Sequence, residues 1–366
     1  MDRREFLKKA GVGTAGGAAV ALAAPAVHAQ GVREMMIVSS WPRDFPGPGT
    51  GSQRLAQRIE KLSEGRLAVK YFAAGERVGA FDVFDEVASG NAHAYTSADY
   101  YWKGKQPGFA YFTSVPFGLT YAEMDSWMKF GGGQQLWDEL SDGYGIKPFP
   151  SGNTGAQMAG WFNKEVNSIE DLNGLKMRIP GLGGDIMSKL GVAPVSLPAS
   201  QSYEALVSGA IDAAEWIGPW NDYFLKYYEV AKYYYYPGMH EAASQLSMGV
   251  NKSWFMDLPE IDRDIIEAAC MMENSMTMAE FNYKSGIYLD KLINEHGVNV
   301  RGYSEDIIDA IGEAADEVFA TTIEHSDLTR RIHESFVKAR AELGRWMVLS
   351  DAGYTQQRNR VLGITA

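Results

Sequence analysis

The sequence is short of cysteine and of basic residues, and each shortage excludes a class of protein. A single cysteine, Cys270, rules out an internal disulfide, so the fold must be stabilised by packing. Cys270 stands in an apolar helical pattern, 268–272, which predicts a buried small side chain. Basic residues number 34 against 46 acidic ones, a formal charge of -12. Nucleic acid and anionic lipid surfaces both require a basic footprint, so neither is expected as a partner.

The N-terminus has the three parts of an export signal. Arg3-Arg4 followed by Phe6-Leu7-Lys8 matches the twin-arginine (Tat) pattern. A mild apolar run, 10–24, and the small-residue site Val27-His28-Ala29 complete it. The sequence therefore predicts Tat export to the periplasm with cleavage near Ala29. Because the leader holds four basic and two acidic residues, the remaining chain carries a formal charge of -14.

Signatures of catalysis and of membrane spanning are missing beyond the leader. There is no Gly-x-Ser-x-Gly nucleophile motif, and the glycine-rich stretch 181–184 lacks the Lys-Ser/Thr of a P-loop. The six histidines show neither HExxH nor a paired metal spacing. No later stretch approaches about 18 unbroken apolar residues. We therefore expect no enzyme, and keep a Tat-exported periplasmic enzyme with a redox cofactor as an alternative of another class.

Strands and helices alternate after the leader, which predicts an α/β fold. Strands at 35–41, 67–72 and 92–97 and helices at 53–63 and 81–88 have the spacing of parallel βαβ units, with a Pro/Gly-rich loop at 42–51. The middle of the chain repeats this pattern, with strands expected at 145–150, 158–163, 176–180, 194–197 and 213–216. Long helical patterns follow at 259–296 and 304–349. Such a length exceeds one core, so we expect two α/β lobes with a ligand cleft between them, and long C-terminal helices.

Three groups of residues suggest recognition chemistry. Arg178 lies in an apolar strand pattern, where its guanidinium can pair with a ligand carboxylate or form an ordinary salt bridge to Asp185 or Glu204. Glu215-Trp216 follows an apolar strand, where a carboxylate can bind a hard cation, cap a turn or be solvated.

The third group is the turn of residues 152–157. Turn chemistry explains Asn153 but not Gln157, which we place at the start of a strand. Aromatic side chains provide apolar walls and hydroxyl donors, and the candidates to close a pocket are Tyr100, Tyr101, Trp220 and Phe45.

These residues carry a family likeness over essentially the whole chain after the leader. The chain resembles the DctP-type periplasmic solute receptors of TRAP transporters. The matching stretches are Ala74-Gly75-Glu76-Arg77-Val78, the run 171–181 that contains Arg178, and the run 206–213. In this family the arginine of the second stretch binds a carboxylate, which assigns that role to Arg178. The resemblance also implies the two-lobed periplasmic-binding-protein fold.

Three further stretches are similar to the branch that binds 2-oxo or 2-hydroxy monocarboxylates with a cation. They are 152–158, 214–219 and 234–241. The resemblance implies that Ca²⁺ or Na⁺ is held by Gln157, Glu215, the backbone carbonyl of Trp216, and Glu241, with Gln245 as a substitute for Glu241. We also expect Asn153, Gln157, Tyr100, Tyr101, Trp216 and Trp220 to contact the ligand beside Arg178. An all-oxygen set with two carboxylates suits such hard cations.

The resemblance therefore implies a receptor for a lactate- or pyruvate-like acid that delivers its ligand to the small and large TRAP membrane subunits. A C4-dicarboxylate or sugar-acid receptor without metal is the alternative ligand class. A homodimer through the C-terminal helix is expected as well. The expected division is the Tat signal at 1–29, lobe I at 30–152, lobe II at 153–243, a return to lobe I with the hinge at 244–303, and C-terminal helices at 304–366.

Overall fold

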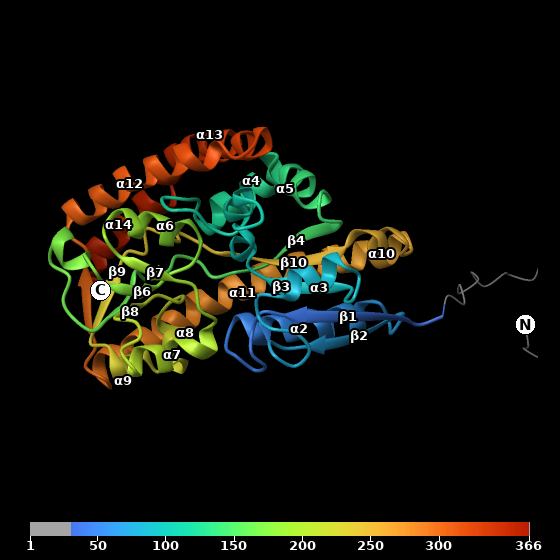
Figure 1. Cartoon of the computed structure of the whole chain (residues 1–366), viewed down its shortest axis with the longest axis horizontal. Helices are drawn as coiled ribbons and strands as arrows, with labels where there is room; N and C mark the ends of the chain where they lie inside the picture. Colours follow the sequence, from blue (N-terminus) through green and yellow to red (C-terminus); the bar gives the residue numbers. More distant parts are fainter. Residues whose placement is uncertain (1–30, 366) are drawn as a thin grey trace, which may run out of the picture. The chain divides into compact units, whose positions relative to one another are not determined.

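Strands from both halves of the chain build the first of two sheets in the computed structural model, which describes residues 31–365 (Figure 1). The predicted export leader lies outside these residues. The strand order is β2-β1-β3-β10-β4, in which β1 pairs in parallel with β2 and β3, and β10 runs antiparallel to β3 and β4. The five strands are β1 (Arg33–Ser39), β2 (Leu67–Phe72), β3 (Ala94–Ser97), β4 (Ile146–Asn153) and β10 (Gln245–Asn251).

The second sheet takes its strands from the middle of the chain. Its order is β11-β9-β5-β8-β6-β7, with β6 parallel to β7 and β8, and β5 antiparallel to β8 and β9. The strands are β5 (Gly160–Phe162), β6 (Lys176–Arg178), β7 (Ala193–Val195), β8 (Ala213–Ala214), β9 (Tyr233–Tyr236) and β11 (Asn299–Gly302). The predicted α/β class is thus confirmed, and the parallel pairs of β1, β2 and β3 are those that the spacing predicted.

Helices connect the strands and complete the C-terminus. α11 is the longest helix, and it packs against α2, β4 and α8 (Figure 1). It therefore contacts β4 of the first sheet and also α8, which follows β8 of the second sheet. Among residues 31–365 no helix is both long enough and apolar enough to cross a bilayer. The helices are α2 (Pro48–Leu62), α3 (Val83–Ala88), η1 (Asp99–Trp102), η2 (Pro107–Phe112), α4 (Tyr121–Phe130), α5 (Gly133–Asp142), η3 (Ile169–Leu172), α6 (Gly181–Lys189), α7 (Ala199–Val207), α8 (Pro219–Phe224), α9 (Tyr227–Val230), α10 (Lys252–Met256), α11 (Glu260–Asn294), α12 (Glu305–Ile323), α13 (Asp327–Leu349) and α14 (Asp351–Leu362).

Two boundaries differ from those predicted, for identifiable reasons. α2 begins inside the expected Pro/Gly loop, because Pro48 occupies its first turn, where a missing N–H costs no hydrogen bond. The helical pattern at 304–349 is split into α12 and α13, because the Ser326 side chain accepts from the Thr329 N–H and starts a new helix. Cys270 is buried in α11 as predicted.

The division into lobes remains a prediction. Strands from 33–153 and 245–251 form the first sheet, and strands from 160–236 and 299–302 form the second. From Arg33 onward, however, the chain forms one compact unit. Three segments pass from one sheet to the other: residues 154–159 from β4 to β5, residues 237–244 from β9 to β10, and residues 252–298, which contain α11, from β10 to β11. The first two matter for the site, and we call them the connectors.

Candidate functional site

The two connectors lie against each other and carry several candidate side chains. The Gln157 N–H donates to the Glu241 carbonyl at 3.2 Å, and the Gly238 N–H donates to the Gln157 carbonyl at 3.1 Å. A Cβ at position 238 would lie 2.6 Å from that same carbonyl oxygen, so this close approach requires glycine. The pairing therefore brings Gln157 next to Glu241, although 84 positions separate them in the sequence.

Arg178 ends β6 with its side chain buried beneath the connectors. Its Nη1 donates to the Glu215 backbone carbonyl at 2.8 Å and also to the Glu215 carboxylate, while Nε donates to the Leu197 carbonyl at 3.1 Å. Burial disfavours the charged guanidinium, but Glu215 and the neighbouring Tyr101, Tyr100 and Tyr227 together outweigh it and raise the pKa of Arg178. Among the described residues Nη2 has no partner, although it is buried. One arm of the guanidinium thus remains free for an anion.

The salt-bridge alternative for Arg178 was wrong about its partners. Asp185 accepts two bonds of 2.6 Å from Lys103 instead. Among the described residues Glu204 forms no ion pair with Arg178. The guanidinium of Arg178 forms its ion pair with Glu215 instead. The physical reason is position: Glu215 follows β8, the strand adjacent to β6, and its backbone pairs with Arg178 across that ladder.

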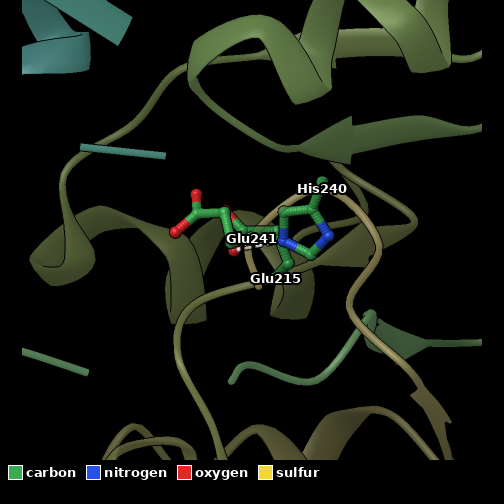
Figure 2. Close-up of side chains that lie close together, drawn as sticks. All are labelled: Glu215, His240 and Glu241. Atoms are coloured by element: carbon green, nitrogen blue, oxygen red, sulfur yellow. Dashed lines mark hydrogen bonds and ion pairs between the residues drawn. The ribbon is translucent and has the colours of Figure 1, made fainter. Parts of the chain in front are cut away.

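Two carboxylates and an imidazole form a buried cluster next to Arg178 (Figure 2). Metal-ligating atoms of Glu215, His240 and Glu241 all lie within 4.8 Å of one another. His240 Nε2 contacts Glu215 Oε2 at 3.1 Å, and the Ser244 hydroxyl donates to Glu241. Burial opposes a charge on His240, but the hydrogen bond to Glu215 and the negative charges of Glu215 and Glu241 together outweigh it and raise the His240 pKa. Burial, followed by repulsion from Glu215, raises the pKa of Glu241 to about 7. A cation placed here would offset that repulsion.

Gln157 adds a neutral oxygen to this cluster. Its amide nitrogen donates to the hydroxyls of Thr154 at 3.1 Å and Ser244 at 3.0 Å, which fixes the orientation of the side chain. The Oε1 atom is buried and has no partner within residues 31–365. Gln157 lies three residues before β5 rather than at the start of a strand, because the pairing with the second connector holds it there.

Gln245 and Asn153 are occupied in supporting bonds. The Gln245 amide donates to the Gly152 carbonyl at 2.6 Å and to Asn274 at 2.7 Å, and its oxygen accepts from Asn153 at 3.4 Å. The Asn153 oxygen accepts from the Gly155 N–H at 2.9 Å. Because the Gln245 side chain is occupied in these bonds, Glu241 is the better candidate of the two to contact a cation. Asn153 stabilises the turn at Gly155, where the first connector begins.

A small chamber opens beside Gln157 and Trp216, which we call the ligand chamber. Its volume of about 10 Å³ is close to the space that one water molecule needs. Trp216 lies under Arg178, whose guanidinium carbon is 4.6 Å from the centre of the indole ring, and the indole N–H is buried without a partner among the described residues. The chamber is lined by Trp41, Ala98, Tyr100, Tyr101, Thr154, Gln157, Trp216, Ile217, Ser244 and Leu246.

The aromatic candidates differ in where they lie. Tyr100 and Tyr101 reach the chamber from η1, a helix that the sequence did not predict. Phe45 contacts the Trp216 ring with their centres 6.0 Å apart. Trp220 does not line the chamber; its ring packs on Phe281 at 5.2 Å, with the Lys284 ammonium 4.3 Å from its centre.

Four residues near the site were not foreseen: Trp41, His240, Ser244 and Leu246. For His240 a signal existed, since it directly precedes Glu241. Trp41 and Leu246 belong to strands of the first sheet or their ends, and only the tertiary fold brings them opposite Trp216.

Comparison with known proteins places this geometry in a family. The family model described as bacterial extracellular solute-binding protein, family 7 (DctP), matches residues 39–325. A monocarboxylate 2-oxoacid-binding periplasmic protein of Nostoc sp. is 36% identical over 359 residues, which cover 97% of this chain and 98% of that protein.

Two solved TRAP solute-binding proteins have the same fold. That of Pseudoalteromonas atlantica, with bound sodium and pyruvate, has a TM-score of 0.87 and 36% identity over 89% of this chain and 99% of its own. That of Bordetella bronchiseptica, a mixed-occupancy dimer with copurified calcium and picolinate, has a TM-score of 0.88 and 30% identity over 91% of this chain and 98% of its own. The chain therefore belongs to family 7 of the bacterial extracellular solute-binding proteins, the DctP family of TRAP transporter receptors.

Proposed function

We propose that this protein captures a short 2-oxo or 2-hydroxy monocarboxylate, such as pyruvate or lactate, together with one Ca²⁺ or Na⁺ ion. The observation that carries the proposal is a pair of buried atoms that have no partner within residues 31–365: Arg178 Nη2, a cationic donor, and Gln157 Oε1, a neutral acceptor. Leaving such groups unpaired is costly. An acid that brings a carboxylate to Arg178 and a cation to Gln157 satisfies both atoms at once.

The side chains present fit a hard cation. Gln157, Glu215, Glu241 and the Trp216 carbonyl would supply only oxygen ligands, and two of them are charged. His240 Nε2 already donates to the Glu215 carboxylate, so we place His240 behind the carboxylate rather than on the cation. When bound, the cation would supply the positive charge that attracts the 2-oxygen of the acid. The buried site would strengthen both contacts, because little water screens them.

The relatives support the ligand class. The Nostoc relative is a monocarboxylate 2-oxoacid-binding protein, and the Pseudoalteromonas structure holds sodium and pyruvate. The described residues that line the ligand chamber include no lysine or arginine, and Arg178 lies behind the lining residue Trp216, with its guanidinium against the indole ring. That favours a monocarboxylate over a C4-dicarboxylate, which would need a second cationic partner for its distal carboxylate.

We further propose that the receptor works in the periplasm, after Tat export and cleavage near Ala29, and delivers its ligand to the small and large TRAP membrane subunits. Family membership supports the transport role rather than an enzymatic one. We propose that residues 30–152 and 244–303 form lobe I with the hinge, except for β11 (299–302), which pairs with β9 of the second sheet, and that residues 153–243 form lobe II with it. Closure of the lobes would hold Tyr100 and Tyr101 where they lie in this structure, lining the same chamber as Trp216.

We also propose a homodimer through the C-terminal helices. α14 buries none of its own residues, and the end of α13 exposes Trp346 and Leu349, the latter at 79%. Several exposed apolar side chains on two helices that contact each other suggest an interaction surface. The Bordetella relative was solved as a dimer, which supports the same reading here.

Calorimetric titration of unfolded, chelator-treated and refolded protein tests the main proposal. Pyruvate and lactate should bind when Ca²⁺ or Na⁺ is present and far more weakly when neither is. Absence of binding under both conditions would contradict the ligand class. Binding of equal strength without any cation would contradict the metal-assisted mode and revive the metal-free alternative. NMR of the acid after incubation with the protein would distinguish a receptor from an enzyme, since a receptor leaves the acid chemically unchanged.

A further inference from the structure

A second buried chamber lies next to the ligand chamber, and the two share a wall. Its volume is also about 10 Å³, and Trp41 and Leu246 line both chambers. The other residues around the second chamber are Gly47, Pro48, Gly51, Ser52, Thr96, Ser151, Ser247 and Thr277. Two side chains thus separate the ligand chamber from a space on the side of the first sheet and α11.

The second chamber is lined by hydroxyl groups, and we call it the hydroxyl chamber. Five of its lining residues are serine or threonine. Several of these hydroxyls donate to fixed protein groups: Ser52 to the Pro48 carbonyl at 2.7 Å, Ser247 to Asp99 at 2.6 Å, and Thr277 to Glu273 at 2.9 Å. A hydroxyl group that already donates its hydrogen bond can still accept one through the lone pairs of its oxygen. The chamber therefore presents oriented acceptors, which suit a donor group such as a ligand hydroxyl or a water molecule.

The wall between the chambers is made by the fold rather than by chance contact. Trp41 is held on the ligand side, with its ring centre 6.2 Å from those of both Tyr101 and Trp216. Leu246 lies opposite Gly152 in the β10–β4 ladder, where the register shifts between Leu246 and Ser247. Such an irregularity re-aims adjacent side chains. Here the extra residue is Ser151 of β4, because Leu246 faces Gly152 and Ser247 faces Pro150, and Ser151 lines the hydroxyl chamber together with Leu246 and Ser247.

We propose that Leu246, together with Trp41, determines ligand length by closing the ligand chamber against the hydroxyl chamber, and that the hydroxyl chamber becomes a subsite for the distal hydroxyl of a longer 2-oxo acid once Leu246 is shortened. This inference rests on the proposed function. Arg178 and the cation set hold the carboxylate and the 2-oxygen at one end. The tail of the acid then extends toward the wall, where Leu246 stops chains longer than those of pyruvate and lactate. Trimming Leu246 joins the chambers and exposes the acceptors of Thr277 and Ser247 to the tail.

Leu246→Ala is the direct test, with three acids measured by calorimetry in saturating Ca²⁺. Pyruvate has no tail, 5-hydroxy-2-oxopentanoate ends in a hydroxyl, and 2-oxohexanoate has the same number of heavy atoms in its chain but ends in a methyl group. Wild type should bind pyruvate much more tightly than either long acid. Leu246→Ala should gain about tenfold for the hydroxylated acid, the value of one good hydrogen bond, and a smaller factor for 2-oxohexanoate. Leu258→Ala, a buried leucine in a separate cluster, is the matched control and should leave all three affinities unchanged.

The outcomes separate this inference from the proposed function. If wild type fails to bind pyruvate, the proposed function falls. If wild type binds pyruvate but Leu246→Ala leaves the ratio of hydroxylated acid to pyruvate unchanged, only the wall is refuted. An equal gain for 2-oxohexanoate would also refute the subsite, since the chamber would then be no more than added space. Should Leu246→Ala yield little folded protein, Leu246→Val can replace it, because valine suits a strand and makes a smaller opening. The hydroxylated acid should again gain more affinity than 2-oxohexanoate.

Discussion

The guanidinium of Arg178 and the carboxylate of Glu215 form a buried ion pair, and the same Nη1 also donates to the backbone carbonyl of Glu215 at 2.8 Å. Arg178, the proposed partner of the ligand carboxylate, is thereby in contact with Glu215, a proposed ligand of the cation. A cation that draws on the Glu215 carboxylate weakens its hold on Arg178 and leaves more of the guanidinium for the ligand. We therefore expect the two ligands to bind cooperatively, and linkage requires the effect to be reciprocal.

Arg178→Lys should separate charge from geometry. Lysine keeps the positive charge but cannot present two parallel donors, so pyruvate affinity should fall at least about tenfold. Arg178→Ala should abolish binding and also destabilise the fold by about 3–5 kcal/mol, because Glu215 is left buried without its partner. Calorimetry and thermal unfolding measure the two effects. Arg345→Lys, on an exposed position of α13, is the control. Near-normal binding by Arg178→Ala would reduce Arg178 to a structural ion pair.

Gln157→Glu should change which cation is preferred. A third carboxylate beside Glu215 and Glu241 raises the negative charge of the site, which favours Ca²⁺ over Na⁺. In the absence of a cation the added charge is buried and unpaired, so the unfolding temperature should drop in chelator and recover when Ca²⁺ is added. Gln201→Glu, at an exposed position of α7, should show neither effect. An unchanged Ca²⁺ to Na⁺ affinity ratio would remove Gln157 from the cation set.

Much of this arrangement could be predicted from the sequence, because it rests on local patterns. The strand of 67–72 was predicted at its observed bounds, Arg178 was placed in a strand and is the last residue of β6, and Glu215 was placed at a strand end and directly follows β8. The buried state of Cys270 followed from its apolar helical surroundings. Each of these features depends on a few neighbouring residues.

The rest depends on contacts between distant segments. The ion pair of Arg178 with Glu215 requires β6 and β8 to be adjacent, and no local signal indicates that pairing. The wall of Trp41 and Leu246 joins the end of β1 to the start of β10, over 200 positions later. Trp220 illustrates the reverse: its sequence position beside Glu215 and Trp216 suggested a ligand contact, but α8 carries it to Phe281.

His240→Ala should weaken cation binding without touching the cation ligands. His240 Nε2 contacts Glu215 Oε2 at 3.1 Å, and loss of a group that orients a ligand typically costs about 10- to 100-fold in metal affinity. His240→Gln keeps a donor and should restore part of the loss, which a purely structural role would not predict. Cation titration in the presence of saturating pyruvate is the measurement, with His325→Ala at an exposed position as the control. Unchanged cation affinity in His240→Ala would show that Glu215 needs no such support.

Asp222 should make stability depend on pH in mildly acidic solution. It accepts from Trp161 at 2.9 Å, from Tyr234 at 2.7 Å and from two backbone N–H groups after Trp216. Burial nevertheless raises the pKa of Asp222 from 3.8 to about 6. A raised carboxyl pKa means that the folded state holds the proton longer than the unfolded state, so the contribution of Asp222 is full below about pH 4 and is lost as pH rises to about 6. The unfolding free energy of wild type minus that of Asp222→Asn should therefore fall as pH rises over this interval, and it should stay constant above it. A difference independent of pH would contradict the raised pKa.

The C-terminal hairpin provides the final prediction. Leu349 and Val361 are 79% and 69% exposed in the single chain, so replacing them with glutamate removes no internal contact. If α13 and α14 form the dimer interface, Leu349→Glu/Val361→Glu should convert a dimer into a monomer in light scattering, because burying two carboxylates in an apolar interface is costly. The unfolding temperature of the dilute monomer and its affinity for pyruvate should remain unchanged, since the ligand chamber draws no residue from these helices. Glu342→Gln, on the same helix, serves as the control. A wild-type protein that is monomeric at all concentrations would refute the interface, whereas a dimer that survives the double substitution would place it elsewhere on the surface.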